Sequence, residues 1–243
     1  GRIPPLSPTH PEQTINWNPI TETLHNLGLA RANAKVFQTL LGISWMWFFG
    51  AVFLSQFPSF AKEVLHGDAQ VASLLLVLFS VGIGAGSLLC EVLSRGRIEM
   101  GLSPLGAIGM TVFAVDLYVA STALPVSELM DIHSFISQSA HWRLMADLLL
   151  LSLFTGIYSV PMYALIQVDS KTTDVARIIA ANNIINALFM IASALIAGAM
   201  LSAGMSISEV LLWTGVANAV VTTALFVAEP IYLHRLAGWL RGV

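Results

Sequence analysis

Residues 71–93 read VASLLLVLFSVGIGAGSLLCEVL. The stretch has the length that an α-helix needs to cross the hydrocarbon core of a bilayer, roughly 20 residues, and its only charged residue, Glu91, is close to its end. Five other apolar stretches of similar length bring the set to six, namely 36–57, 71–93, 102–124, 144–166, 178–201 and 207–233. The pattern predicts an all-α membrane protein with six transmembrane helices.

The composition agrees with a membrane protein and argues against a soluble one. Hydrophobic residues make up 56% of the chain and charged residues 10%, with a mean hydropathy of +0.77, whereas a soluble domain carries about 25% charged residues. Basic residues form no cluster larger than two, so we expect no nucleic-acid partner. A single cysteine excludes an intrachain disulfide.

The basic residues are divided unequally between alternate connections of the six stretches. If both ends of the chain are cytoplasmic, only Lys62 and Arg143 fall outside. The cytoplasmic side then holds the other nine, which are Arg2, Arg31, Lys35, Arg95, Arg97, Lys171, Arg177, Arg235 and Arg241. Because Lys and Arg are retained on the cytoplasmic side, the division predicts N-in/C-in topology.

The segments around the six stretches suggest four regions. Residues 1–16 hold four of the ten prolines and predict a cytoplasmic linker. Asn18 and Pro19 are a suitable cap and first turn, and residues 17–35 predict an amphipathic helix in the membrane interface, with a solvated linker helix as the alternative. Residues 36–233 form the transmembrane bundle, and 234–243 a cytoplasmic tail leading to a downstream domain. Because the chain starts at Gly1 without Met, we expect it to be a piece of a longer polypeptide.

Small residues indicate where helices approach closely. Gly82 and Gly86 form a small-xxx-small face in the second stretch. Similar contact surfaces are expected at Gly106 and Gly109, and at Ala194 and Gly198. In the outer connection 125–142, an apolar stripe of Leu129, Ile132 and Ile136 predicts a short amphipathic helix, with a polar loop as the alternative.

One ionisable residue lies well inside a predicted span. Asp116, in the third stretch, is costly to bury in a bilayer and is therefore a candidate functional residue. Its carboxylate could bind a cation, relay a proton or pair with a substrate ammonium group. The alternative is a hydrogen-bonded carboxyl that packs two helices together.

Three asparagines open the fifth stretch at Asn182, Asn183 and Asn186. Asn182 and Asn186 are one helical turn apart and share a face, where two carboxamides could hold a polar head group. They could equally join two helices. We treat Asp116 and the three asparagines as the candidate substrate-binding residues.

Other polar residues suggest no further site. Asp147, Glu209, Glu91 and Glu229 fall near span ends, where we expect solvation, and Asn218 is expected in a helix contact. His133 and His141 with Asp131 lack metal-ligand spacing, so we expect no metal and no cofactor. The chain contains no catalytic motif, and we expect no enzymatic activity in this segment.

Two sequence features resemble a known transporter superfamily. Six spans with both ends inside, preceded by a proline-rich linker, resemble the C-terminal half, helices 7 to 12, of a major facilitator superfamily transporter, whose two six-helix halves are related by an axis along the membrane normal. Residues 86–97, GSLLCEVLSRGR, resemble a degenerate form of the superfamily's loop signature of glycine, acid and basic residues, with the acid displaced to Glu91.

A narrower resemblance covers most of the chain. Residues 176–183, ARIIAANN, are similar to the segment entering the eleventh helix of the bacterial lysophospholipid transporter branch. Residues 16–19, NWNP, and 42–45, GISW, are similar to members of this branch that are fused to a glycerolipid acyltransferase. The resemblance implies a facilitator in the bacterial inner membrane whose first six helices precede Gly1 and whose acyltransferase follows Val243.

The function implied is the transfer of lysophospholipid, or a related amphiphile, across the inner membrane by alternating access of the two halves. Membrane lipid, the N-terminal half of the same parent chain and a fused acyltransferase are the expected partners. Two alternatives stay open. The helices could serve as a membrane anchor and scaffold for the downstream enzyme, or as a facilitator for small polar solutes or drugs.

Overall fold

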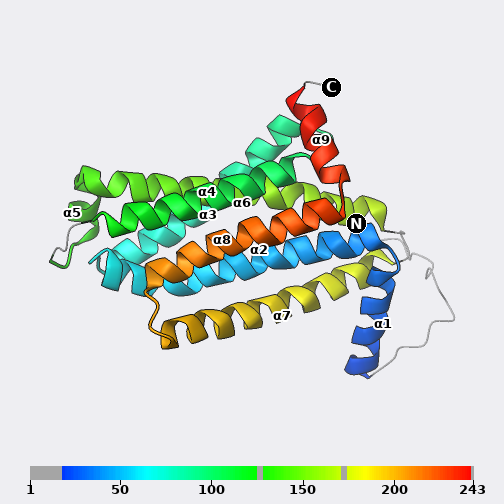
Figure 1. Cartoon of the computed structure of the whole chain (residues 1–243), viewed down its shortest axis with the longest axis horizontal. Helices are drawn as coiled ribbons and strands as arrows, with labels where there is room; N and C mark the ends of the chain where they lie inside the picture. The colour runs from blue at the N-terminus through cyan, green and yellow to red at the C-terminus, as the bar shows by residue number, and fades with distance from the viewer. Residues whose placement is uncertain (1–17, 125–127, 171–173, 242–243) are drawn as a thin grey trace, which may run out of the picture.

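The computed structural model describes residues 18–124, 128–170 and 174–241, and it is nearly all helical (Figure 1). The helices in this part of the chain are α1 (Pro19–Arg31), α2 (Ala34–Ser59), α3 (Ala69–Ser94), α4 (Leu102–Thr122), α5 (Ile132–Ser137), α6 (Trp142–Asp169), α7 (Val175–Ser202), α8 (Ile207–Ala228) and α9 (Ile231–Leu240). A π-helical turn, η1 (Phe60–Val64), continues α2, and a 3₁₀ turn, η2 (Ser139–His141), leads into α6. The predicted linker 1–16 lies outside the described residues.

Six helical segments in the described ranges are long and apolar enough to cross a membrane. They are Ala34–Val64, Ala69–Ser94, Leu102–Thr122, Ser139–Asp169, Val175–Ser202 and Ile207–Ala228. The prediction of six such helices, and of an almost entirely helical fold, is therefore confirmed. The assignment to one half of a facilitator and the N-in/C-in topology stay predictions.

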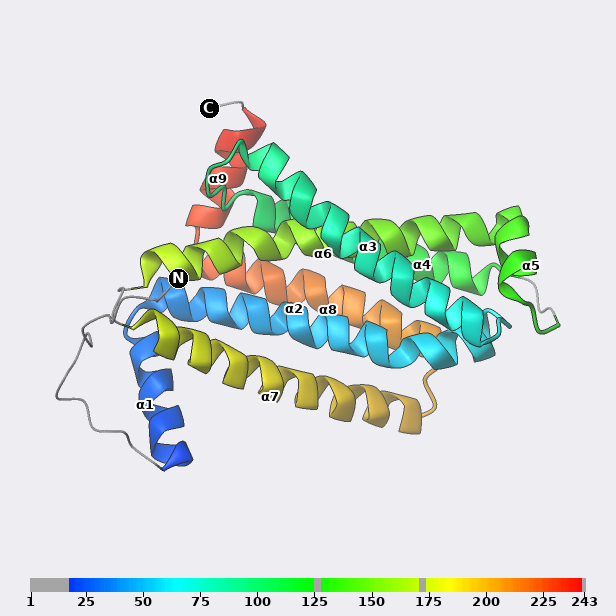
Figure 2. The same ribbon diagram turned by 180° about the vertical axis from the view of Figure 1, so that it is seen from behind.

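The long helices run side by side and connect at alternate ends (Figures 1 and 2). We call the end with α5 and η1 the α5 end, and the end with α1 and α9 the α9 end. Lys62 and Arg143 belong to the α5 end. The other described Lys and Arg residues belong to the α9 end, and they are Arg31, Lys35, Arg95, Arg97, Arg177, Arg235 and Arg241. The fold thus separates the basic residues as the sequence predicted, whichever side of a membrane each end faces.

Polar side chains at the helix starts explain several of the boundaries. Asp68 accepts hydrogen bonds from the backbone N–H groups of Gln70, at 2.8 Å, and Val71, at 3.1 Å, and so begins α3. Ser206 and Glu209 form a reciprocal capping box at the start of α8. Such bonds satisfy backbone N–H groups that have no partner in the first turn of a helix.

Helix α6 lies at the centre of one side of the bundle, in contact with α2, α3 and α4. Glycines allow α3 and α4 to approach α6 closely. A Cβ atom at Gly82 or Gly86 of α3 would overlap Ser152 or Leu153 of α6. The predicted packing role of Gly82 and Gly86 is therefore confirmed.

Glycines of α4 behave in the same way, but a glycine of α7 does not. A Cβ at Gly106 would lie 2.5 Å from the backbone nitrogen of Tyr158, and one at Gly109 would overlap the Phe154 ring. At Gly198 of α7, in contrast, a Cβ would meet nothing within 4 Å. The predicted contact surface at Ala194 and Gly198 has no partner helix at Gly198 in the described part of the chain.

Helix α2 supplies the aromatic part of the core. Phe49, Phe53 and Phe57 are fully buried. Phe49 stacks on Phe53 with a centroid distance of 4.7 Å, and Phe57 meets Phe79 of α3 edge-on at 5.5 Å. The Phe57–Phe79 contact joins α2 and α3 near the α5 end. In Figure 2 the two helices diverge from there towards the α9 end, and α6 passes behind α3.

The two short helices at the α9 end differ from the sequence-based boundaries. The predicted interfacial helix 17–35 ends earlier, because α1 stops at Arg31 and α2 starts at Ala34 after the cap residue Asn33. The prediction that the sixth span reaches residue 233 is wrong, because α8 stops at Ala228. A new helix, α9, then begins after Pro230, whose ring cannot continue the preceding helix. The predicted boundary between bundle and tail at 233/234 falls inside α9.

The predicted helix in the connection near the α5 end is present as α5. Its buried side chain is Phe135, while Leu129 and Ile136 of the expected apolar stripe are exposed. Phe135 stacks on His141 with a centroid distance of 4.1 Å, and the His141 Nδ1 atom is hydrogen-bonded to the Phe135 carbonyl oxygen at 2.9 Å. His141 therefore serves to hold this connection in place.

Candidate functional site

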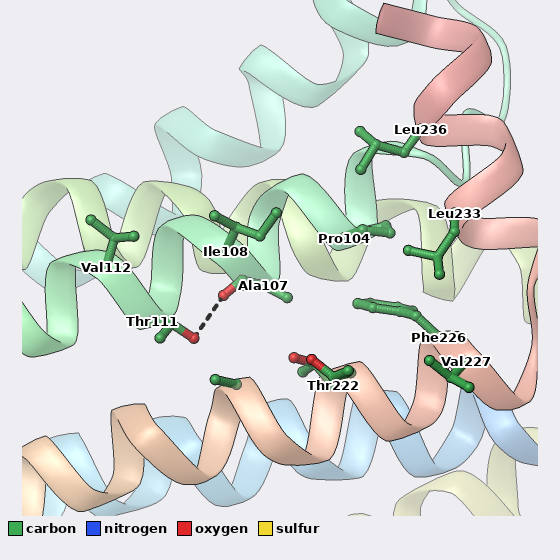
Figure 3. Close-up of a pocket in the computed structure, with 12 residues that line it drawn as sticks. Pro104, Ala107, Ile108, Thr111, Val112, Thr222, Phe226, Val227, Leu233 and Leu236 are labelled. Atoms are coloured by element: carbon green, nitrogen blue, oxygen red, sulfur yellow. Dashed lines mark hydrogen bonds between the residues drawn. The ribbon is translucent and has the colours of Figure 1, made fainter.

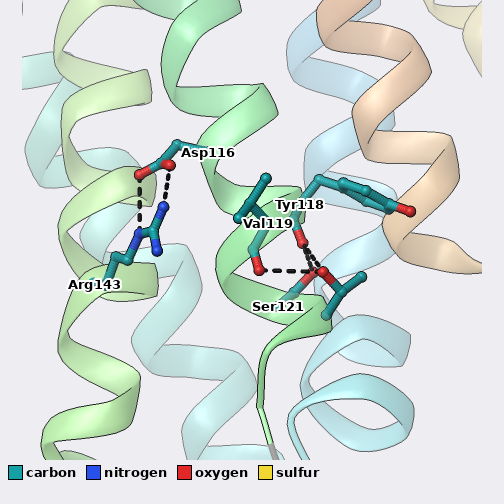
Figure 4. Close-up of polar contacts among 6 residues, drawn as sticks. Asp116, Tyr118, Val119, Ser121 and Arg143 are labelled. Atoms are coloured by element: carbon teal, nitrogen blue, oxygen red, sulfur yellow. Dashed lines mark hydrogen bonds and ion pairs between the residues drawn. The ribbon is translucent and has the colours of Figure 1, made fainter.

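Asp116 is paired with a basic residue of the neighbouring helix (Figure 4). It lies on α4 six residues before the last residue of that helix, and Arg143 is the second residue of α6. The Arg143 Nε atom donates to Asp116 Oδ2 at 3.2 Å, and Arg143 Nη2 donates to Asp116 Oδ1. The bidentate geometry is the strong form of an Arg–carboxylate interaction. Both side chains are partly exposed, 35% for Asp116 and 54% for Arg143.

A second carboxylate adjoins this pair. Asp147 lies one helical turn after Arg143 on α6, is 4% exposed and interacts with both Asp116 and Arg143. Its Oδ2 atom is buried and has no hydrogen-bond partner among the described residues. The guanidinium contacts at the α5 end are made by Asp116, and the Asp147 carboxyl lies buried beside this pair. We call Asp116, Arg143 and Asp147 the acidic cluster.

The sequence located Asp116 but not its surroundings. Arg143 was predicted only as a basic residue of the outer connection, and Asp147 was expected to be solvated at a span end. The structure buries Asp147 instead, because α4 packs along α6 at this level. Arg143 and Asp147 are four residues apart and therefore share one face of their helix. This spacing, at the start of the span that follows the one with Asp116, was the signal from which the cluster could have been predicted.

The three asparagines do not act as one set. Asn182 and Asn186 are buried, 4% and 7% exposed, on the side of α7 that packs against α2. Asn186 Oδ1 accepts a hydrogen bond of 2.7 Å from Ser44 Oγ of α2. Asn183 is exposed. The face shared by Asn182 and Asn186 is therefore a helix contact, which was the second of the two expectations for it.

The structure does not bring Asp116 and the asparagines into one site. Asp116 lies near the α5 end of α4, whereas Asn182 lies seven residues from the start of α7, near the α9 end. Their helices also have different neighbours, since α4 packs on α6 and α8, and α7 on α1 and α2. The four predicted residues therefore cannot contact one small head group together.

Two polar contacts made by tryptophans were not predicted. Trp45 Nε1 donates to Asn218 Oδ1 at 2.9 Å, and Asn218 Nδ2 donates to the Ala107 carbonyl oxygen and to Thr111 Oγ1, both at 3.0 Å. The fully buried Asn218 thereby joins α2, α8 and α4, which agrees with its expected helix-contact role.

The second contact, unlike the first, is on an exposed face. Trp47, 40% exposed, donates from Nε1 to the Tyr163 hydroxyl of α6 at 2.8 Å. Trp47 and Tyr163 thus place two amphipathic rings at the junction of α2 and α6.

The least covered helices, α3 and α7, each carry a stripe of small or polar residues. The α3 stripe is exposed or half-exposed and consists of Ser73, Ser80, Gly84, Ser87 and Glu91. The α7 stripe is exposed and consists of Ala176, Asn183, Ala187, Ala194 and Gly198. Spacings of three, four and seven residues place each stripe on one helical face.

The rest of the exposed surface of α7 has a different character. Leu188, Ile191 and Leu195 are 57%, 59% and 69% exposed and follow a separate line along the helix. A bulky apolar line is typical of a lipid-facing surface, while a small-residue line allows another helix to approach closely. The serine hydroxyls of the α3 stripe donate to carbonyl groups four residues earlier, so they need no water.

Comparisons of the chain with protein-family models, with curated proteins and with solved structures found no match.

Proposed function

We propose that this bundle is the second half of a membrane transporter of the major facilitator type, and that it moves lysophospholipid or a related amphiphile across the bacterial inner membrane by alternating access. The observation that carries the proposal is the uneven cover of the six helices. In their most apolar windows, 28% of α3 and 22% of α7 is buried, against 61% for α2 and α6. The bundle exposes stripes of small or polar residues on α3 and α7. Such a surface is suited to pack against a second six-helix half from the same parent chain.

The residues available to the proposed pathway are those whose side chains are exposed. Asn183 in the α7 stripe is the asparagine available to contact a head group, because Asn182 and Asn186 lie in the α2 contact. The Trp47–Tyr163 pair offers aromatic faces and a hydroxyl to an amphiphile at the junction of α2 and α6. The acidic cluster lies at the far end of the bundle from Asn183, and we assign it to the contact between α4 and α6 near that end.

A second candidate function, a membrane anchor and scaffold for a fused glycerolipid acyltransferase, is favoured by one observation. Asp116 is bonded to Arg143, and Asn182 and Asn186 lie in the contact with α2, so three of the four candidate binding residues serve helix contacts. A facilitator for small solutes or drugs would use the same exposed face as the lipid transporter, and only a transport assay separates the two substrates.

The test is lysophospholipid uptake by vesicles that contain the parent chain, with radiolabelled lysophosphatidylethanolamine as the probe. Gly84 is exposed on the α3 stripe, and a Cβ there would meet nothing within 4 Å. We therefore expect Gly84→Trp to leave the bundle folded and to reduce uptake at least tenfold by filling the space between the halves.

Val81→Trp is the matched control, because Val81 is 55% exposed on α3 but lies outside the stripe. It should keep most of the uptake. Wild-type parent chain that transports no lysophospholipid, while a fused acyltransferase stays active, would favour the anchor. Uptake of an unrelated polar solute in place of the lipid would favour the solute facilitator.

A further inference from the structure

An apolar groove runs between α4 and α8 and ends beneath α9 (Figure 3). Its volume is about 240 Å³. The side chains that shape it include Ile108 and Val112 of α4, Phe226 and Val227 of α8, and Leu233 and Leu236 of α9. We call it the α9 groove.

Helix α9 is held firmly over this groove. A Cβ at Gly101 would lie 2.5 Å from the backbone nitrogen of Leu236, so α9 rests directly on the start of α4. Trp239 Nε1 donates to the Leu93 carbonyl oxygen of α3 at 3.2 Å, and the Tyr232 and Thr39 hydroxyls are hydrogen-bonded at 2.9 Å. The groove is thus preformed, and an occupant would not have to order α9.

The groove is open sideways and is suited to a hydrocarbon chain. Ile108, Val112 and Val227 are 57%, 53% and 62% exposed. The hydroxyls of Thr111 and Thr222 in its wall donate to carbonyl groups of their own helices, at 3.1 Å and 2.6 Å. No polar group of either threonine is therefore left unsatisfied when an alkyl chain replaces water.

The charge of α9 indicates the head group. Residues 231–241 contain His234, Arg235 and Arg241 and no acidic residue, and all three side chains are exposed. Leu233, Leu236 and Leu240 recur at helical spacing on another side of the same helix. A helix with an apolar side and a basic side next to a membrane span is typical of one that lies at the lipid surface and attracts anionic lipid.

We propose that α9 and the α9 groove form a binding site for an anionic phospholipid, with one acyl chain in the groove and the phosphate-bearing head group at Arg235 and Arg241. The site requires no partner half and no transport activity. It would persist if the proposed function failed, provided that the bundle spans a membrane.

Native mass spectrometry of the chain, released from nanodiscs of mixed phosphatidylglycerol and phosphatidylcholine, tests the site. We expect one phosphatidylglycerol to be retained with at least tenfold preference over phosphatidylcholine, because each basic residue near a lipid surface favours anionic lipid. Arg235→Gln with Arg241→Gln should abolish the preference. Lys62→Gln, at the other end of the bundle, should keep it. Equal retention of both lipids by the wild-type chain would overturn the head-group assignment.

The acyl-chain position is tested with a matched pair on α8. Ala219 lines the groove, and the neighbouring Val220 is 66% exposed and does not. Ala219→Phe should reduce the amount of bound phosphatidylglycerol at least tenfold, and Val220→Phe should leave that amount unchanged. If Ala219→Phe does not fold, Val112→Trp replaces it at the opposite wall. Undiminished lipid on the folded groove variant, or a second copy of the chain in place of the lipid, would disprove the proposal.

Discussion

Helices α6 and α7 are both 28 residues long and both apolar, yet one is embedded in the bundle and the other lies at its edge. Half of the residues of α6 are buried, 14 of 28, against 7 of 28 for α7. Hydropathy does not distinguish them, since α7 has the higher value, 2.2 against 1.8. The difference shows that hydropathy identifies a span, whereas close contacts between helices decide which span is central.

The largest effect should come from a glycine in the contact between α3 and α6. Gly86→Leu places a side chain where Leu153 backbone atoms lie, and backbone cannot move aside as a flexible side chain can. We expect a loss of about 3 kcal/mol or more in the free energy of unfolding. The measurement is thermal unfolding in detergent together with the monodisperse fraction in size-exclusion chromatography.

Gly84→Leu is the control for this substitution, two residues away in the same helix and with open space around it. Its unfolding temperature should stay near that of the wild-type chain. Equal destabilisation by the two substitutions would mean that α3 does not pack on α6 through Gly86.

A smaller effect is expected from the buried amide that joins three helices. Asn218→Leu removes three hydrogen bonds and leaves the Trp45 indole N–H without its acceptor. The cost should be about 1–2 kcal/mol, because polar contacts between membrane helices contribute modestly. Asn183→Leu on the exposed side of α7 should cost almost nothing. Chemical unfolding curves of the two variants would refute the assignment if their order were reversed.

The docking of α9 gives a prediction for alkaline pH. Burial raises the pKa of Tyr232 from 10.0 to about 12. The folded protein therefore binds the phenol proton more tightly than the unfolded chain does. The contribution of Tyr232 to stability is complete below pH 10 and is lost as the pH rises through about 12.

Tyr232→Phe should weaken this alkaline loss of stability, and the comparison is best made by thermal unfolding at pH 9 and pH 11. An identical pH dependence in the variant and the wild-type chain would show that Tyr232 is not the titrating group.

The smallest effect should come from the acidic cluster. Arg143→Gln leaves Asp116 without its partner and beside Asp147, so we expect a slight fall in the unfolding temperature. The fall is small because both partners are partly exposed. Adding Asp116→Asn to Arg143→Gln should restore part of the loss. If the double variant were less stable than the single one, Asp116 would have another partner.

How far the sequence predicted this protein depends on the range of the interaction concerned. The six apolar stretches and the packing role of Gly82 and Gly86 were visible, because each is local in the chain or set by composition. The end of the sixth span was not, since its apolar pattern continues across Pro230 into α9. The side of the membrane that each end faces stays a prediction.

The sequence indicated which residues could belong to the candidate site, but not how these residues are arranged. The sequence indicated Asp116 and the asparagines as polar groups inside apolar stretches. It gave no partner for Asp116, which lies 27 residues from Arg143, and no means to separate the exposed Asn183 from the buried Asn182 and Asn186. Those differences depend on which helices pack together.

The sequence by itself thus determined that the chain forms six long apolar helices with basic residues collected at one end, because length, hydropathy and charge are properties of single segments. Only the tertiary structure decided that α6 is central and α7 peripheral, that Asp147 is buried beside Asp116, and that a groove between α4 and α8 ends beneath α9. Each of these depends on contacts between segments far apart in the chain, where the shape of one helix surface has to fit another.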